Sequence, residues 1–129
     1  MEKLLRQEEL YFCPIGNVFN LDEAEEVIKK LGFYWRYPLV PNLFLIFIDE
    51  PSRSTTQEQY RLDPKMSLPY VLLIQISETE MQINQFAGSD FDDYSKMFIC
   101  WILKNYKCNV YNEMGTDLTS SLPNPSELK

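Results

Sequence analysis

Three aspartates with the spacing of a metal site lie just before the longest apolar run of the chain. Asp90, Asp92 and Asp93 belong to GSDFDDYSKMFICWILKNY, in which seven consecutive apolar residues follow Lys96. Their carboxylates could hold Mg²⁺, which prefers oxygen ligands. However, the sequence contains no glycine-rich phosphate cradle and no GKS or GKT motif. We therefore favour a helix start, where Ser89 or Asp90 would be the N-cap and the carboxylates would favour the positive end of the helix dipole.

A second carboxylate pair, Asp49 and Glu50, follows the apolar run LFLIFI. Active-site carboxylates often lie at strand ends, and a glycosidase or nuclease needs two of them at a defined separation. A solvated strand end that enters a loop explains the same residues. The enzymatic alternative is a small metal-dependent hydrolase that uses only the carboxylates at 49–50 and 90–93.

The chain contains no histidine. This absence removes the Ser-His and Cys-His nucleophile pairs and the usual zinc sites. It also removes the side chain best suited to acid–base chemistry near neutral pH. The three cysteines, Cys13, Cys100 and Cys108, form no CxxC motif and their odd number does not suit a disulfide framework. We expect a protein without catalytic activity, metal or cofactor.

The charge of the chain suits a basic partner, and an ordinary acidic, solvated surface explains it equally well. Its 129 residues include 19 acidic and 12 basic residues, a net charge of -7. This charge disfavours nucleic acid and anionic membranes as partners. The segment from Glu78 to Asp117 contains seven acidic residues and three lysines, a net charge of -4. Aromatic side chains among these acids are candidate anchors, so the predicted partner-binding residues here are Asp90, Asp92, Asp93, Tyr94, Tyr111, Glu113 and Asp117.

The aromatic stretch GFYWRYP is a second candidate contact surface. Tyrosine, tryptophan and arginine are enriched at interface hot spots. We therefore add Arg36 and Tyr37 to the predicted partner-binding residues. Phe33 and Trp35 are expected to close the core instead.

Two helices must position these candidates. In NLDEAEEVIKKLG, Asn20 is a suitable N-cap, apolar residues recur at spacings of three and four, and Gly32 is the expected left-handed terminator. A second helix is predicted over 91–106, apolar on most sides, with Phe98 and Trp101 buried.

The strands are read from shorter apolar runs. We expect them at ELYFCPIG, at NLFLIFIDE with both faces buried, at YVLLIQIS and MQINQFAG as a hairpin, and at CNVYNE. Residues 51–69 are polar and contain three prolines, so they are predicted to lack regular structure. The expected fold is α+β, with a mainly antiparallel sheet of about five strands and two helices packed on it. Residues 1–119 would form one domain and 120–129 a flexible C-terminal tail.

In general character the chain resembles the small acidic immunity proteins of bacterial toxin–immunity pairs. The resemblance rests on size, acidity, the lack of catalytic groups, and the stretches FYWRYP and SDFDDY. It implies a single cytoplasmic domain that binds and blocks a cognate toxin, often a basic nuclease. The start of the sequence has no apolar signal segment and no run is long enough for a membrane span, so the cytoplasm is the default. A homodimeric scaffold, with the apolar helix at its interface, is a further alternative.

Overall fold

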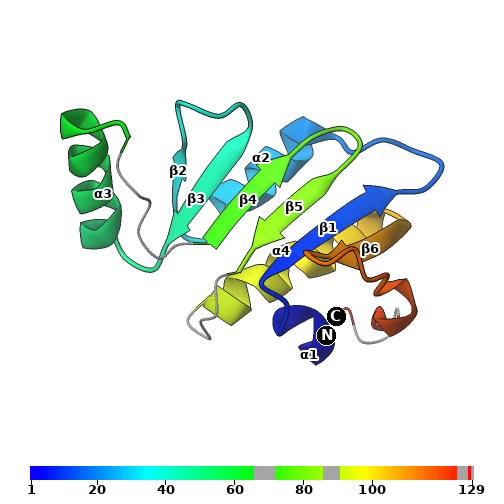
Figure 1. Cartoon of the computed structure of the whole chain (residues 1–129). Helices are drawn as coiled ribbons and strands as arrows, with labels where there is room; N and C mark the ends of the chain where they lie inside the picture. The colour runs from blue at the N-terminus through cyan, green and yellow to red at the C-terminus, as the bar shows by residue number, and fades with distance from the viewer. Residues whose placement is uncertain (66–71, 86–90, 125–127, 129) are drawn as a thin grey trace.

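The computed structural model describes residues 1–65, 72–85, 91–124 and 128 (Figure 1). They form one antiparallel sheet in the order β2-β3-β4-β5-β1-β6. The strands are β1 (Glu9–Pro14), β2 (Phe33–Arg36), β3 (Leu43–Phe47), β4 (Leu72–Ile76), β5 (Met81–Asn84) and β6 (Cys108–Asn112). The helices are α1 (Glu2–Leu5), α2 (Leu21–Lys29), α3 (Glu50–Leu62) and α4 (Asp92–Asn105), followed by the short 3₁₀ helix η2 (Thr119–Ser121). The α+β class with an antiparallel sheet is confirmed, with one more strand and two more α-helices than predicted.

The main core lies between the sheet and the helices α1, α2 and α4, which cover the same face (Figure 1). Alternate strand residues such as Phe12, Ile74 and Val110 point into it, because successive side chains of a strand face opposite sides. They meet the apolar stripes of the helices, among them Ile28 of α2 and Phe98 of α4. The helix predicted over 91–106 is confirmed as α4 (Asp92–Asn105).

A smaller core lies on the other face, where α3 packs over β2 and β3. Its centre is an aromatic triad of Trp35, Tyr37 and Tyr60, whose ring centroids lie 5.4 to 5.6 Å apart. Residues 44–47 of β3 are all buried, because they alternate between the two cores. The prediction that this strand is buried on both faces is confirmed.

The prediction that residues 51–69 lack regular structure is wrong for its first part, because these residues continue α3. Asp49 is the N-cap, since its carboxylate accepts from the Ser52 N–H at 2.8 Å. Pro51 lies in the first turn, where a helix needs no N–H donor. Arg53 links α3 to β2. Its guanidinium donates to the Tyr34 carbonyl at 3.1 Å and lies over the ring of Phe33. Residues 66–69 lie outside the described residues.

The first predicted helix is confirmed, but its terminator is not. Asn20 is the N-cap and accepts from the Glu23 N–H at 3.1 Å. Positive φ angles occur at Gly16 and Gly115 among the described glycines, and not at Gly32. Gly32 instead permits a close approach: a Cβ at this position would lie 3.1 Å from Cζ of Tyr94. The absence of a side chain at Gly32 thus allows close packing between the end of α2 and α4.

The start of α4 also differs from expectation. Its N-cap is Phe91, which makes no capping hydrogen bond with its side chain. Asp92 and Asp93 occupy the first turn, where carboxylates are stabilised by the helix dipole. The proposed caps, Ser89 and Asp90, lie outside the described residues.

Candidate functional site

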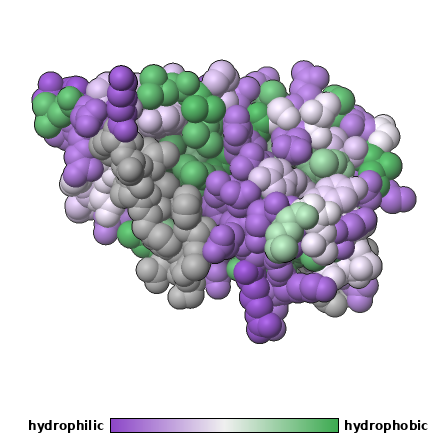
Figure 2. Space-filling view, in the orientation of Figure 1, coloured by the Kyte–Doolittle hydropathy of each residue, from purple (hydrophilic) through white to green (hydrophobic). Residues whose placement is uncertain are grey.

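One face of the sheet carries no described helix over the strands β4, β5, β1 and β6 (Figure 1). A row of side chains crosses these strands, because Gln75 pairs with Gln82, Gln82 with Tyr11, and Tyr11 with Tyr111. All of them are half-buried. Figure 2, in the same orientation, shows hydrophilic side chains over the middle of the molecule. We call this surface the open face and define it by Glu9, Tyr11, Gln75, Gln82, Asn84 and Tyr111.

Hydrogen bonds within the open face hold its side chains in place. The Tyr11 hydroxyl donates to Oε2 of Glu9 at 2.5 Å. Gln82 Nε2 donates to Oδ1 of Asn84 at 3.1 Å, along the same strand. Both pairs join residues two apart on a strand, whose side chains lie on one side of the sheet. Two pairs of polar side chains on the face are therefore oriented by hydrogen bonds between them.

The electrostatic environment of the open face is acidic. The hydrogen bond to Glu9, burial, and the charges of Glu9, Glu80 and Glu113 together raise the pKa of Tyr11 to about 12. No lysine or arginine occurs in β1, β4, β5 or β6 to offset these carboxylates. The open face and its two flanking glutamates thus favour positively charged groups.

Both flanking glutamates are positioned by turns. Glu80 ends the β4–β5 turn, where its N–H donates to Ser77 Oγ at 3.0 Å. Glu113 follows β6, and its carboxylate accepts from the Glu9 N–H at 3.3 Å. The turn after it is ordered by Asn112, whose Oδ1 accepts from the Met114 and Thr116 N–H groups, both at 3.0 Å.

Tyr11 and Cys13 on this face, and Cys108 in the main core, keep their protons at neutral pH. Tyr11 keeps its proton at neutral pH because its pKa is about 12. Burial and the charge of Glu80 raise the pKa of Cys13, which disfavours a reactive thiolate. Burial and the neighbouring Cys13 raise the pKa of Cys108 to about 11. Among the described residues, no three or more metal-ligating side chains gather into a cation site. The arrangement is suited to binding a cationic surface.

The predicted acidic surface is divided between the two sides of the sheet. Tyr111 points to the open face, and Asp117 forms an isolated bridge with it at the outer edge of β6. Hydrogen bonds from the side chain and from the N–H of Thr119 lower the pKa of Asp117, and the N–H donates to its carboxylate at 2.8 Å. Together with Glu113, these residues gather at the end of β6.

Two of the other predicted acids, Asp92 and Asp93, belong to α4, which covers the opposite side. Asp92 and Asp93 begin this helix, and Asp90 lies outside the described residues. Tyr94 packs against the main core and against Gly32. The structure therefore does not bring Asp92, Asp93 or Tyr94 onto the surface that Tyr111 faces.

Arg36 and Tyr37 have structural partners within the chain. Tyr37 is only 9% exposed, within the aromatic triad of the smaller core. Arg36 donates to Glu25 Oε1 at 2.7 Å and to Asn42 Oδ1 at 3.0 Å, and its guanidinium lies over the ring of Phe44. The contacts of Arg36 join α2 to the sheet. Tyr37 offers little surface to a partner because it is buried.

The carboxylates of the hydrolase alternative also have local roles. Asp49 caps α3, and the hydrogen bond from Ser52 lowers its pKa. Glu50 pairs with Arg53 one turn along the same helix and accepts from the Ser54 hydroxyl. Both residues are explained by the start of α3.

Sequence reasoning missed Glu9, Tyr11, Gln75 and Gln82. The signal was the alternation in LLIQI and MQIN, whose buried residues alternate with half-buried ones. Tyr11 shows the same alternation with Leu10 and Phe12 in β1. The alternation identifies the face, but only the strand order places these residues side by side.

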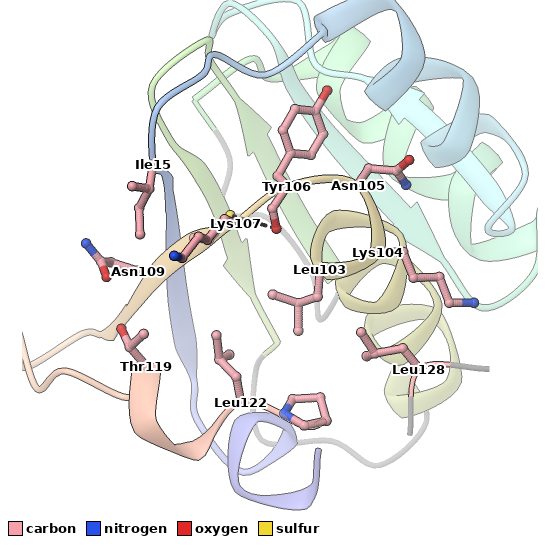
Figure 3. A pocket seen from close by; sticks show the side chains of 12 residues that line it. Ile15, Leu103, Lys104, Asn105, Tyr106, Lys107, Asn109, Thr119, Leu122 and Leu128 are labelled. Atoms are coloured by element: carbon pink, nitrogen blue, oxygen red, sulfur yellow. Dashed lines mark hydrogen bonds between the residues drawn. The ribbon is translucent and has the colours of Figure 1, made fainter. Parts of the chain in front are cut away.

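A separate hollow of about 540 Å³ lies beyond the C-terminal end of α4 (Figure 3). Leu103, Leu122 and Leu128 come together in it from α4, from the residue after η2 and from the C-terminal segment. Leu128 is 6% exposed, so its side chain covers part of this apolar surface. Of the predicted tail, residues 120–121 belong to η2 and Leu128 is buried, whereas residues 125–127 and 129 lie outside the described residues.

Comparison of the chain with protein-family models, with curated protein sequences and with solved structures finds no match. The described helices include none that is both long enough and apolar enough to cross a membrane. The class of molecule that the structure defines is an α+β domain with a half-covered antiparallel sheet.

Proposed function

We propose that this chain is a non-catalytic binding protein that neutralises a basic protein partner, as the immunity protein of a bacterial toxin does. The observation that carries this proposal is the position of Glu9, Glu80 and Glu113 around Tyr11, next to strands that contain no lysine or arginine. The open face is the contact surface. Tyr111, which pairs with Tyr11 on this face, provides a second aromatic anchor.

The chemistry of the open face suits a protein partner. Tyrosines combine a large apolar ring with a polar edge and are enriched at interface hot spots. Half-buried glutamine and asparagine side chains offer both donors and acceptors to the partner's backbone and side chains. The carboxylates steer an oppositely charged partner and raise its rate of association.

A nuclease toxin is the partner class that fits this charge best. A nuclease must present basic residues to the phosphates of its substrate, since these contacts dominate its affinity. An acidic face that covers them would block the substrate. The proposed location is the cytoplasm, where such a substrate is found, and neither nucleic acid nor membrane is a partner.

A neutralisation assay tests the proposal. The product of the reading frame immediately upstream of this chain's gene is expressed in a bacterial host, alone and together with the chain. The expected result is growth arrest by the upstream product alone, rescue by the chain, and a complex of the two purified proteins. An upstream product that is harmless, or growth arrest that the chain does not relieve, contradicts the proposal.

Three matched variants locate the contact. The first replaces Glu9, Glu80 and Glu113 with glutamine, and the second replaces Asp22, Glu23 and Glu26 of α2 with their amides. The third replaces the aspartates at 90, 92 and 93 with asparagine, which tests the surface predicted from the sequence. Each variant loses three negative charges, so a loss of rescue confined to the first variant assigns binding to the open face and not to net charge.

A further inference from the structure

The outer side of α4 bears a groove of about 520 Å³ that faces away from the sheet. Met97 is 53% exposed there, and Cys100 and Trp101 are half-buried beside it. The buried residues of α4, such as Phe98 and Ile102, point the other way into the main core. A charged residue stands at each end of the groove, which is lined by Asp93, Lys96, Met97, Cys100, Trp101 and Lys104.

The charges at the two ends have opposite signs. Asp93 lies in the first turn of α4, and Lys104 in the last. If two such helices pack antiparallel about a two-fold axis between positions 97 and 100, the aspartate of each copy faces the lysine of the other. A parallel pair would place like charges together, which is unfavourable. The groove is therefore complementary to itself in one orientation only.

The remaining groove residues are also complementary in this orientation. The axis that brings Asp93 opposite Lys104 also brings Met97 opposite Cys100, which gives an apolar centre. It brings Lys96 opposite Trp101, and an ammonium over an indole ring is a favourable cation–π contact. Two-fold symmetry is the commonest arrangement of homo-oligomers and requires such a self-complementary patch.

We propose that two copies of this chain associate through α4, antiparallel, with reciprocal Asp93–Lys104 ion pairs around a Met97–Cys100 centre. This association goes beyond the proposed function and uses the helical side of the sheet, so the open face of each copy remains accessible. An interface of one helix from each copy buries less than about 1,200 Å² in total, which is typical of weak complexes. We expect monomer and dimer to exchange over the micromolar concentration range.

Sedimentation of the full chain over that range measures the dimer. Charge reversal at either end, Asp93→Lys or Lys104→Asp, should raise the dissociation constant by about tenfold, because two ion pairs become like-charge contacts. The double variant restores opposite charges across the axis and should return the dissociation constant most of the way to that of the unmodified chain. Asp92→Lys and Lys30→Asp, which make the same changes of charge at helix ends outside the groove, should leave it unchanged.

A second pair of variants guards against misfolding of the charge-reversed proteins. Met97→Glu places a charge at the centre and should abolish the dimer. Met114→Glu, at a position that is 83% exposed in the turn after β6, is its control. A chain that stays monomeric at the highest concentration overturns the proposal. So does a dimer that is unaffected by Met97→Glu, or a double reversal that restores nothing although the variant is folded by circular dichroism.

Discussion

Tyr11 and Glu9 lie on the same side of β1, and the Tyr11 hydroxyl donates a hydrogen bond to the Glu9 carboxylate at 2.5 Å. The two charges nearby, on Glu80 and Glu113, come from a turn between strands and from the end of β6. Three segments that are distant in the sequence thus converge on one phenol. The acidity of the open face is a property of the fold as well as of the composition.

This convergence predicts that Tyr11 titrates unusually late. Its pKa is about 12, because the neutral phenol donates to Glu9 and the phenolate would be repelled by the carboxylates. The folded pKa lies above the unfolded value of about 10. The resulting stabilisation is therefore fully present below pH 10 and is lost as the pH rises through about 12. Ultraviolet absorbance of tyrosinate should show a late transition that is missing in Tyr11→Phe.

Glu9→Gln is the companion variant for this titration. The amide still accepts the hydrogen bond but carries no charge, so the transition should move toward the ordinary range. Tyr11→Phe should lower the free energy of unfolding at neutral pH by about 1 kcal/mol, as expected for a lost hydrogen bond. A late transition that persists in Tyr11→Phe would show that another tyrosine produces it.

The close packing of Gly32 against Tyr94 gives the second prediction. Gly32→Ala would place a methyl group 3.1 Å from Cζ of the ring, which is closer than ordinary contacts. We expect a loss of about 1 kcal/mol in the free energy of unfolding, since overpacking outweighs the entropy gained by removing a glycine. Chemical denaturation measures this loss.

A double-mutant cycle separates packing from backbone strain. On the background of Tyr94→Ala, the same Gly32→Ala change should cost nothing or stabilise the protein, because the ring is gone. An equal cost on both backgrounds would mean that the backbone of Gly32, and not its neighbour, requires glycine.

The third prediction concerns the two large aromatic residues of α4. The expectation that both are buried is confirmed for Phe98, which is fully buried, whereas Trp101 is half-buried and stacks on Phe98. Phe98→Ala should therefore cost about 3–5 kcal/mol, and Trp101→Ala clearly less. Thermal denaturation ranks the two. The opposite order would mean that Trp101, and not Phe98, is the main anchor of α4 in the core.

Elements defined by local signals could be predicted from the sequence. The helix after Asn20 has a cap and an apolar stripe, and both are present in the structure. The strand of residues 43–47 is an unbroken apolar run, and it is buried on both faces. These features depend on neighbours in the chain, so the sequence contains the necessary information.

Features that depend on tertiary contacts could not be predicted. The polar helix α3 has a weak apolar stripe, and Tyr60 finds its partners, Trp35 and Tyr37, only through the fold. The open face exists because β1 lies between β5 and β6, an order that no local pattern encodes. For the same reason, acids that are close in the sequence are divided between the open face and α4.

The central claim is that the open face receives a cationic partner, and an NMR titration with an oligoarginine peptide tests it most directly. The account predicts that amide shifts concentrate at Glu9, Tyr11, Gln82 and Tyr111, weaken as salt rises, and disappear when Glu9, Glu80 and Glu113 are changed to glutamine. The α2 variant with Asp22, Glu23 and Glu26 neutralised should retain them. Shifts that centre on α2 or on Asp92 and Asp93, or that are equally reduced in both variants, would contradict the account.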